Sequence, residues 1–129
     1  MSTELMLLVW STTLFGGYVG VQSILYRMQH GIDFANSARD GEGLPNLWNA
    51  RAEKALRNLI ETYGVFVALA VATELSGRSD GFTQWGAQLY FWARWAYLPL
   101  YLGGVQYVRG LVWSVAATGL ALMFFGVAF

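Results

Sequence analysis

Charged and amide side chains recur on one face of an otherwise apolar segment. Arg51, Lys54, Asn58 and Glu61 follow one another at intervals of three or four residues, so a helix places them on one stripe, with Arg57 beside it. Arginine and lysine bind carboxylates, and a carboxylate holds an amine. The pattern therefore predicts a site for a zwitterionic small molecule with several carboxylates.

The depth of Glu61 supports a functional interpretation. Glu61 precedes Thr73, where this apolar segment ends, by 12 residues, which is about 18 Å of helix. In a hydrocarbon core of about 30 Å, Glu61 then lies about 12 Å below the near face. Intramembrane carboxylates are usually paired and functional. The alternative is that Arg51, Lys54 and Arg57 extend to lipid headgroups while Glu61 pairs with Arg57 in a structural role.

A second polar group is expected on a later helix. Arg94, Tyr97 and Tyr101 share one face by their spacing, and Arg109 follows them. Tyrosines near membrane ends often belong to the interfacial belt, but an arginine in lipid needs an acceptor, and we expect Glu61 to supply it. Arg109 alone also fits the positive charge at a cytoplasmic helix end.

The elements that position these residues are four hydrophobic helices. The 129 residues are 56% hydrophobic and only 12% charged, half the charge of an average soluble chain. Apolar segments long enough to span a bilayer occur at about 5–27, 47–74, 82–102 and 108–128. We expect an all-α integral membrane protein, a single domain over 1–129 built as a four-transmembrane-helix bundle. Residues 29–46 are expected to form a water-exposed loop.

Composition excludes several function classes. Eight basic and eight acidic residues cancel, so the positive field that nucleic-acid binding requires is absent, and no nucleic-acid partner is expected. The absence of cysteine excludes disulfides, thiolate metal sites and a cysteine nucleophile. A single histidine argues against a histidine metal site, and we expect no metal. Thiol chemistry would have to use the thiol of another molecule.

Basic residues also predict the orientation. One side of the expected bundle carries six of them near the helix ends, and the other side carries only Arg78. The positive-inside rule makes the richer side cytoplasmic, with both termini outside. Those six residues are Arg27, Arg39, Arg51, Lys54, Arg57 and Arg109.

Two motifs resemble those of a known family. RAEKALRNLIET at 51–62, followed by apolar residues, is similar to the second-helix signature of the membrane-associated proteins in eicosanoid and glutathione metabolism, the MAPEG family. RWAYLPLY at 94–101, followed by RGLVW at 109–113, is similar to the next part of that family's pattern. The similarity extends from about residue 27 to the C-terminus.

The resemblance implies a homotrimer of four-helix protomers that binds glutathione between neighbours near the cytoplasmic face. By this match, Arg51 and Lys54 hold glutathione carboxylates and Arg57 lines the same wall, while Asn58 and Glu61 read its backbone and amino group. The third-helix wall and the remaining matched positions are Arg94, Tyr97, Tyr101 and, more approximately, Arg27. Arg109 matches the catalytic arginine that stabilises the thiolate.

Three positions depart from the family pattern. Lys54 stands where arginine is common, Tyr97 where many members have histidine, and Gly64 where proline is common. Binding is still expected, whereas the rate and the second substrate are not defined by the motifs.

The function that this resemblance implies is a membrane-bound glutathione transferase or peroxidase-like enzyme of detoxification. Glutathione is the co-substrate, and a lipophilic electrophile or hydroperoxide arrives from the bilayer, which is expected to be a bacterial inner membrane. The alternative is a non-enzymatic MAPEG-like membrane subunit, or small-ligand binder, without significant turnover.

Overall fold

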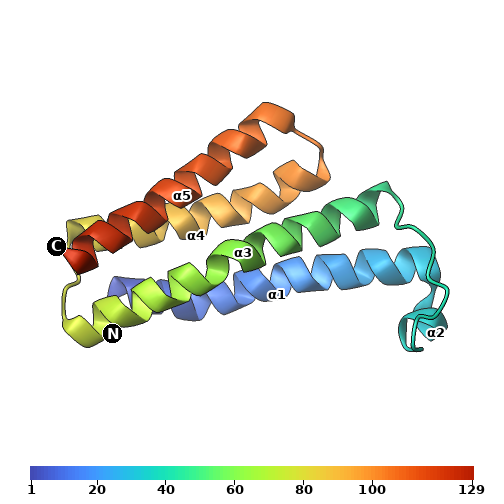
Figure 1. The fold of residues 1–129 in the computed structure, drawn as a ribbon, viewed down its shortest axis with the longest axis horizontal. Helices are drawn as coiled ribbons and strands as arrows, with labels where there is room; N and C mark the ends of the chain where they lie inside the picture. Colours follow the sequence, from blue (N-terminus) through green and yellow to red (C-terminus); the bar gives the residue numbers. More distant parts are fainter.

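The computed structural model describes all residues 1–129, and every regular element in it is a helix (Figure 1). Four helices are long and one is short. In chain order they are α1 (Thr3–His30), α2 (Ile32–Ala35), α3 (Leu47–Ser76), α4 (Gly81–Leu102) and α5 (Gln106–Ala128).

The segment expected to be a continuous loop over 29–46 was predicted wrongly at its start. Helix α1 continues to His30, where the N–H of Gly31 donates to the carbonyl of Arg27 at 2.8 Å. Gly31 has φ +89°, a conformation that glycine adopts at little cost, and it turns the chain into α2. Glycine and asparagine signals in this segment therefore mark a break between two helices as well as a loop.

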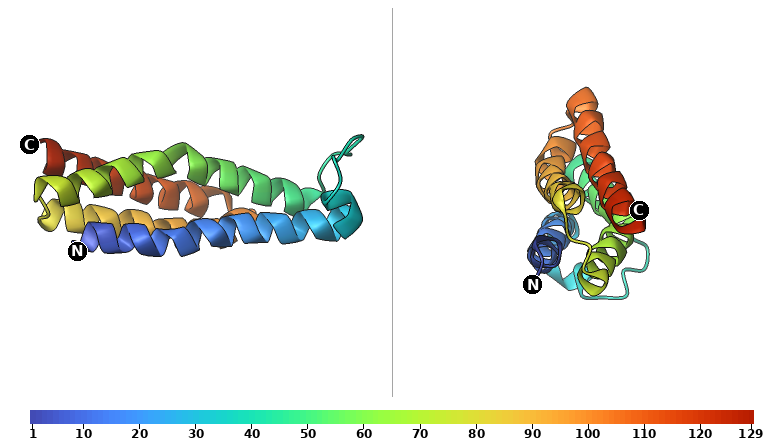
Figure 2. Two further views of the ribbon diagram at one scale, coloured as in Figure 1. Left: turned by 90° about the horizontal axis from the view of Figure 1, so that it is seen from below. Right: turned by 90° about the vertical axis from the view of Figure 1, so that its left-hand side faces the viewer.

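The helices form two antiparallel hairpins. Helices α1 and α3 lie side by side, and α4 packs along α5 (Figure 1). Figure 2 shows both chain termini at one end of the bundle and α2 with its loop at the other end. The two hairpins are joined by a short turn in which Gly77 has φ +66° and Asp80 caps α4 by accepting from the Thr83 N–H at 3.0 Å.

Small residues bring α4 and α5 unusually close. A Cβ atom added to Gly86 would lie 2.4 Å from the Gly119 carbonyl oxygen, and one added to Gly119 would lie 2.5 Å from that of Gly86. Helices in a membrane associate largely through such close backbone packing. The two glycines therefore fix the α4–α5 hairpin.

The interior of the bundle is aromatic and aliphatic, with hydroxyl pairs across helices. Phe66 of α3 stacks on Tyr90 of α4 with ring centroids 4.5 Å apart, and both are fully buried. The hydroxyls of Ser11 and Tyr63 lie 2.7 Å apart and join α1 to α3. These contacts hold α1, α3 and α4 around one core.

Three helices, α1, α3 and α5, are long and apolar enough to cross a membrane. Helix α4 has the length but is not among them, because Gln84, Gln88 and Arg94 lower its hydropathy. The expectation of four spans therefore has hydropathy support for three helices, and the fourth span remains a prediction.

The terminus end of the bundle is closed by hydrogen bonds to carboxylates. Glu4 is fully buried, and both of its carboxylate oxygens accept from the Ser79 hydroxyl, at 3.1 and 2.9 Å. The Ser2 N–H donates to Glu74 at 2.9 Å. The start of α1 is thus tied to the end of α3 and to the turn before α4.

Candidate functional site

Arg94 is the largest fully buried side chain of the protein. Its Nη1 donates to the Oδ1 of Asn58 on α3 at 2.9 Å. Its Nε and Nη2 are buried without a hydrogen-bond partner. A guanidinium in this state is costly, and buried unpaired polar groups in a native structure call for an explanation.

The expected acceptor of Arg94 was wrong. Glu61 was predicted to supply it, but the bond is made by Asn58, one helical turn away. Residues three apart on a helix differ by about 60° in direction, and here Asn58 is half-buried toward α4 whereas Glu61 is exposed. Spacing placed both residues on one stripe but did not decide which edge of the stripe faces α4.

Aromatic rings surround the Arg94 guanidinium. Its central carbon lies 4.3 Å from the ring centroid of Tyr97 and 5.8 Å from that of Tyr18. Such ring faces attract a cation and offset part of its desolvation. The Tyr18 hydroxyl donates to the Arg94 backbone carbonyl at 2.5 Å. Sequence reasoning missed Tyr18, because it lies 76 positions away from Arg94 and carried no motif.

The row of residues predicted along α4 continues to α5. The rings of Tyr97 and Tyr101 meet edge to face with centroids 5.6 Å apart, and the Arg109 guanidinium carbon lies 4.4 Å from the Tyr101 ring centroid. Arg94, Tyr97, Tyr101 and Arg109 therefore form one continuous series of stacked groups. Arg109, at its outer end, is half-buried, whereas Arg94 at the inner end is not exposed at all.

Arg51 joins the start of α3 to the turn between α4 and α5. Its Nη1 donates to the Leu102 carbonyl at 2.9 Å, and a Cβ atom on Gly104 would lie 2.8 Å from its Nη2. Gly104 has φ +69°, so this position favours glycine for its backbone as well as for space. Arg51 therefore has one donor committed to the fold.

The remaining predicted residues are not drawn into this series within one chain. Lys54, Arg57 and Glu61 lie exposed on the outer face of α3. Arg27 donates to the Ser23 carbonyl of its own helix at 3.2 Å. The structure thus separates Arg94 and Tyr97, which are buried, from the exposed charges of the α3 stripe, with the half-buried Asn58 between them.

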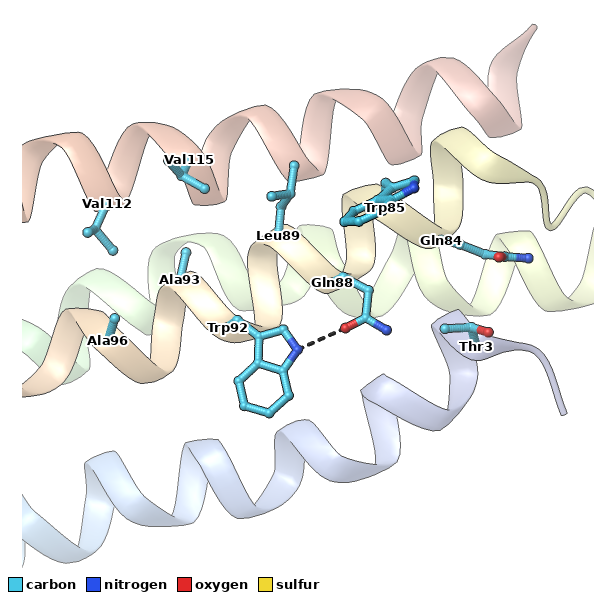
Figure 3. A pocket seen from close by; sticks show the side chains of 10 residues that line it. All are labelled: Thr3, Gln84, Trp85, Gln88, Leu89, Trp92, Ala93, Ala96, Val112 and Val115. Carbon is cyan, nitrogen blue, oxygen red and sulfur yellow. Dashed lines mark hydrogen bonds between the residues drawn. The ribbon is translucent and has the colours of Figure 1, made fainter.

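An apolar groove follows α4 between α1 and α5 (Figure 3). Its volume is about 690 Å³. In its wall the indole N–H of Trp92 donates to Gln88 Oε1 at 2.8 Å. One end is formed by Ala96 and Val112 (Figure 3), and Val112 lies one helical turn beyond Arg109. The lining residues are Thr3, Gln84, Trp85, Gln88, Leu89, Trp92, Ala93, Ala96, Val112 and Val115.

The family model described as MAPEG family matches residues 5–129, essentially the whole chain. The chain has no significant match among curated proteins or among solved structures.

Proposed function

The chain belongs to the MAPEG family, and we propose that it is a membrane-bound glutathione transferase with peroxidase-like capacity. Its glutathione site comprises the exposed stripe of α3 and the stacked series that runs from Arg94 to Arg109. Membership in the family supports a role of this general kind, and the specific activity is our proposal.

One observation carries the proposal. Glu61 is exposed on α3, a helix that is long and apolar enough to cross a membrane, and Lys54 and Arg57 precede it on the same exposed face. Charged side chains inside a bilayer face protein or a water-filled cavity, not lipid. We propose that in the membrane this face is covered by another chain and holds a polar ligand, as it would in a homotrimer with glutathione between protomers.

Glutathione suits the charges on this surface. Its two carboxylates would bind Arg51 and Lys54, with Arg57 on the same wall, and its amino group would bind Glu61. Asn58 would bind its peptide backbone. Arg27, near the end of α1 at the same end of the bundle, would form a more distant part of the site.

The chemistry follows from the half-buried Arg109. A free thiol has a pKa near 8.5, and a guanidinium within hydrogen-bond distance favours the thiolate. The thiol proton passes to water, and the thiolate sulfur attacks an electrophilic carbon and expels its leaving group. With a hydroperoxide, the thiolate attacks the distal oxygen and breaks the O–O bond. The alkoxide then takes a proton, and the glutathione sulfenic acid condenses with a second glutathione to give the disulfide and water.

The groove along α4 is our candidate for the path of the lipophilic second substrate. It is mostly apolar, it lies along a helix of the membrane domain, and it ends at Ala96 of α4 and at Val112, one helical turn beyond Arg109 on α5. An electrophile dissolved in the bilayer would reach the thiolate along this groove without crossing water.

The arrangement in the membrane is part of the same proposal. We propose four spans, a site on the cytoplasmic side of a bacterial inner membrane, and both termini outside, on the basis of the six-to-one bias in basic residues. The termini do lie at one end of the bundle, as an even number of spans requires (Figure 2). Reporter fusions at the C-terminus test the orientation, and native mass spectrometry in mild detergent tests the trimer.

Titration of the purified protein with glutathione at neutral pH, followed by ultraviolet absorbance of the thiolate, tests the activity. Wild-type protein should bind glutathione and show thiolate, and Arg109→Ala should lose the thiolate signal while keeping measurable affinity. The matched control is Arg78→Ala, which removes an exposed arginine at the opposite end of the bundle, where the Arg78 guanidinium donates to the Val127 carbonyl. Absence of glutathione binding at millimolar concentration in the wild type would reject the proposal.

A second candidate function is a MAPEG-like membrane subunit or small-ligand binder without significant turnover. It is favoured by the burial of Arg94 and Tyr97, which are 0% and 4% exposed and so offer little surface to a ligand. Wild-type protein that binds glutathione but neither forms thiolate nor conjugates a small aromatic halide would support this candidate.

A further inference from the structure

The contact between Arg94 and Asn58 fixes the direction in which the Asn58 amide faces. A guanidinium has donors and no acceptor, so the Asn58 atom that lies 2.9 Å from Arg94 Nη1 has to be the carbonyl oxygen. The amide nitrogen must then point away from Arg94. Unlike many asparagine side chains, this one has its orientation set by the chemistry of its partner.

The free amide nitrogen lies toward the exposed stripe. Asn58 is half-buried, and its amide nitrogen is absent from the buried atoms that lack a partner. Lys54 and Glu61, both exposed, lie one helical turn before and one after it on the same stripe. The exposed stripe therefore offers a ligand two kinds of hydrogen-bond donor, the two amide N–H groups of Asn58 and the ammonium of Lys54. Glu61 supplies the acceptor.

Stability alone does not account for Arg94. Two of its three guanidinium nitrogens are buried and unbonded, and exchange of a buried ion for apolar side chains of similar volume is often neutral or stabilising. Its one side-chain hydrogen bond is the bond that orients Asn58. Burial of Arg94 therefore costs folding free energy, and its one side-chain hydrogen bond fixes the orientation of the Asn58 amide.

We infer that Arg94 is a positioning residue that holds Asn58 as a donor, so that the ligand group bound at Asn58 is an acceptor. This inference rests on the proposed function, because it assigns a carbonyl or carboxylate oxygen of glutathione to Asn58 and leaves the amino group to Glu61. On this inference Arg94 does not itself contact glutathione, but orients Asn58, which does.

Asn58→Asp is the sharpest test. Aspartate accepts from Arg94 as asparagine does, but it removes both N–H donors. The variant should unfold at the same temperature as the wild type or higher, while its glutathione affinity falls on the order of a hundredfold, because a charged acceptor then faces the ligand's acceptor without a donor between them. Asn58→Ala should lose both stability and affinity. If Asn58 served only to anchor Arg94, Asn58→Asp would bind glutathione like the wild type, and that result would overturn the inference.

A pair of variants at Arg94 tests the positioning role from the other side. Arg94→Lys keeps a donor for the Asn58 carbonyl and should bind glutathione within about threefold of the wild type, whereas Arg94→Met frees the amide to rotate and should bind about tenfold more weakly, the equivalent of one lost hydrogen bond. Thermal unfolding of Arg94→Met should be little changed. Unaltered binding by Arg94→Met would reject the positioning role.

The outcomes separate this inference from the proposed function. Wild-type protein that does not bind glutathione rejects the function and, with it, the assignment of a glutathione acceptor to Asn58. The order of thermal stability, with Asn58→Asp at or above the wild type and Asn58→Ala below it, still decides whether the Arg94 bond orients the amide. Glutathione binding by the wild type together with unchanged binding by Asn58→Asp rejects only the inference.

Discussion

Glu4 and Arg94 are both completely buried charged side chains, yet the structure treats them in opposite ways. At the terminus end, both oxygens of Glu4 accept from Ser79. In the other half of the bundle, Arg94 has one hydrogen bond and two unbonded nitrogens. Burial of a charge therefore does not by itself distinguish a structural group from a functional one. Whether its buried polar atoms are left without a partner is the more useful criterion, and it identifies a closed end and an open one.

The largest expected effect is that of replacing Arg109, the outermost member of the stacked series at the open end. Arg109→Ala should lower the rate of glutathione conjugation to a small aromatic halide by about a hundred- to a thousandfold, the usual result of removing a group that stabilises a reacting anion. Steady-state kinetics at saturating glutathione measure it. Arg109→Lys, which keeps the charge, should recover part of the rate. Equal losses in both variants would indicate that the guanidinium geometry, and not its charge, is what matters.

The next effect is on binding, at the exposed stripe. Glu61→Gln keeps the shape of the side chain and removes its charge, so glutathione affinity should fall on the order of a hundredfold if the group binds the amino group in a desolvated interface. Isothermal titration calorimetry measures it. Because Glu61 is exposed in the single chain, the thermal stability of that chain should barely change. A large loss of stability with intact binding would show that Glu61 has a structural role. The open end would then resemble the closed end, where charges serve stability.

At the closed end the same kind of change should act on stability alone. Ser79→Ala removes the donor to both Glu4 oxygens and should cost about 2 kcal/mol of unfolding free energy, since a buried carboxylate is left unpaired. Unfolding in detergent measures this cost. Ser76→Ala, which removes an exposed hydroxyl bonded to its own helix, is the control and should change it by less than about 0.5 kcal/mol. Glutathione affinity should be unaltered in both variants, and a loss of affinity in Ser79→Ala would mean that the two ends are coupled.

The smallest effect is expected at Lys54, where the family commonly has arginine. Lys54→Arg should tighten glutathione binding by no more than about threefold, because a planar guanidinium can bind a carboxylate through two parallel bonds. Calorimetry on the same preparation detects this change. A tenfold loss would show that the stripe has room for a compact ammonium only.

The sequence was sufficient for the long helices and for the family, because hydrophobic spacing and two motifs determine both. It was not sufficient for the acceptor of Arg94. Asn58 and Glu61 share a stripe, and the choice between them depends on how α3 is rotated against α4, which is a property of the packed core. Tyr18 was missed for the same reason, since only the packing of α1 on α4 brings it to the Arg94 carbonyl.

The short helix α2 and the groove along α4 were also beyond sequence reasoning. Gly31 reads as a loop signal, and only its φ of +89° shows that it separates two helices. Trp85 lines the groove with Gln84 and Gln88, although no motif in the sequence marks these three residues. A tryptophan in a belt and a tryptophan in a groove have the same local sequence, and only the position of the neighbouring helices distinguishes them.

The close approach of Gly86 and Gly119 has a consequence for the choice of membrane. Helix α4 has 22 residues, about 33 Å of helix, and its backbone packs so closely on α5 at these two glycines that neither position has room for a side chain. The longer helix α3, with 30 residues, can fit a thicker bilayer by standing more upright and a thinner one by tilting, but the shorter α4–α5 hairpin has no such reserve of length. Hydrophobic mismatch would then draw Arg109 below the headgroups in lipids with long acyl chains, so lipid chain length becomes a variable that tunes this half of the protein.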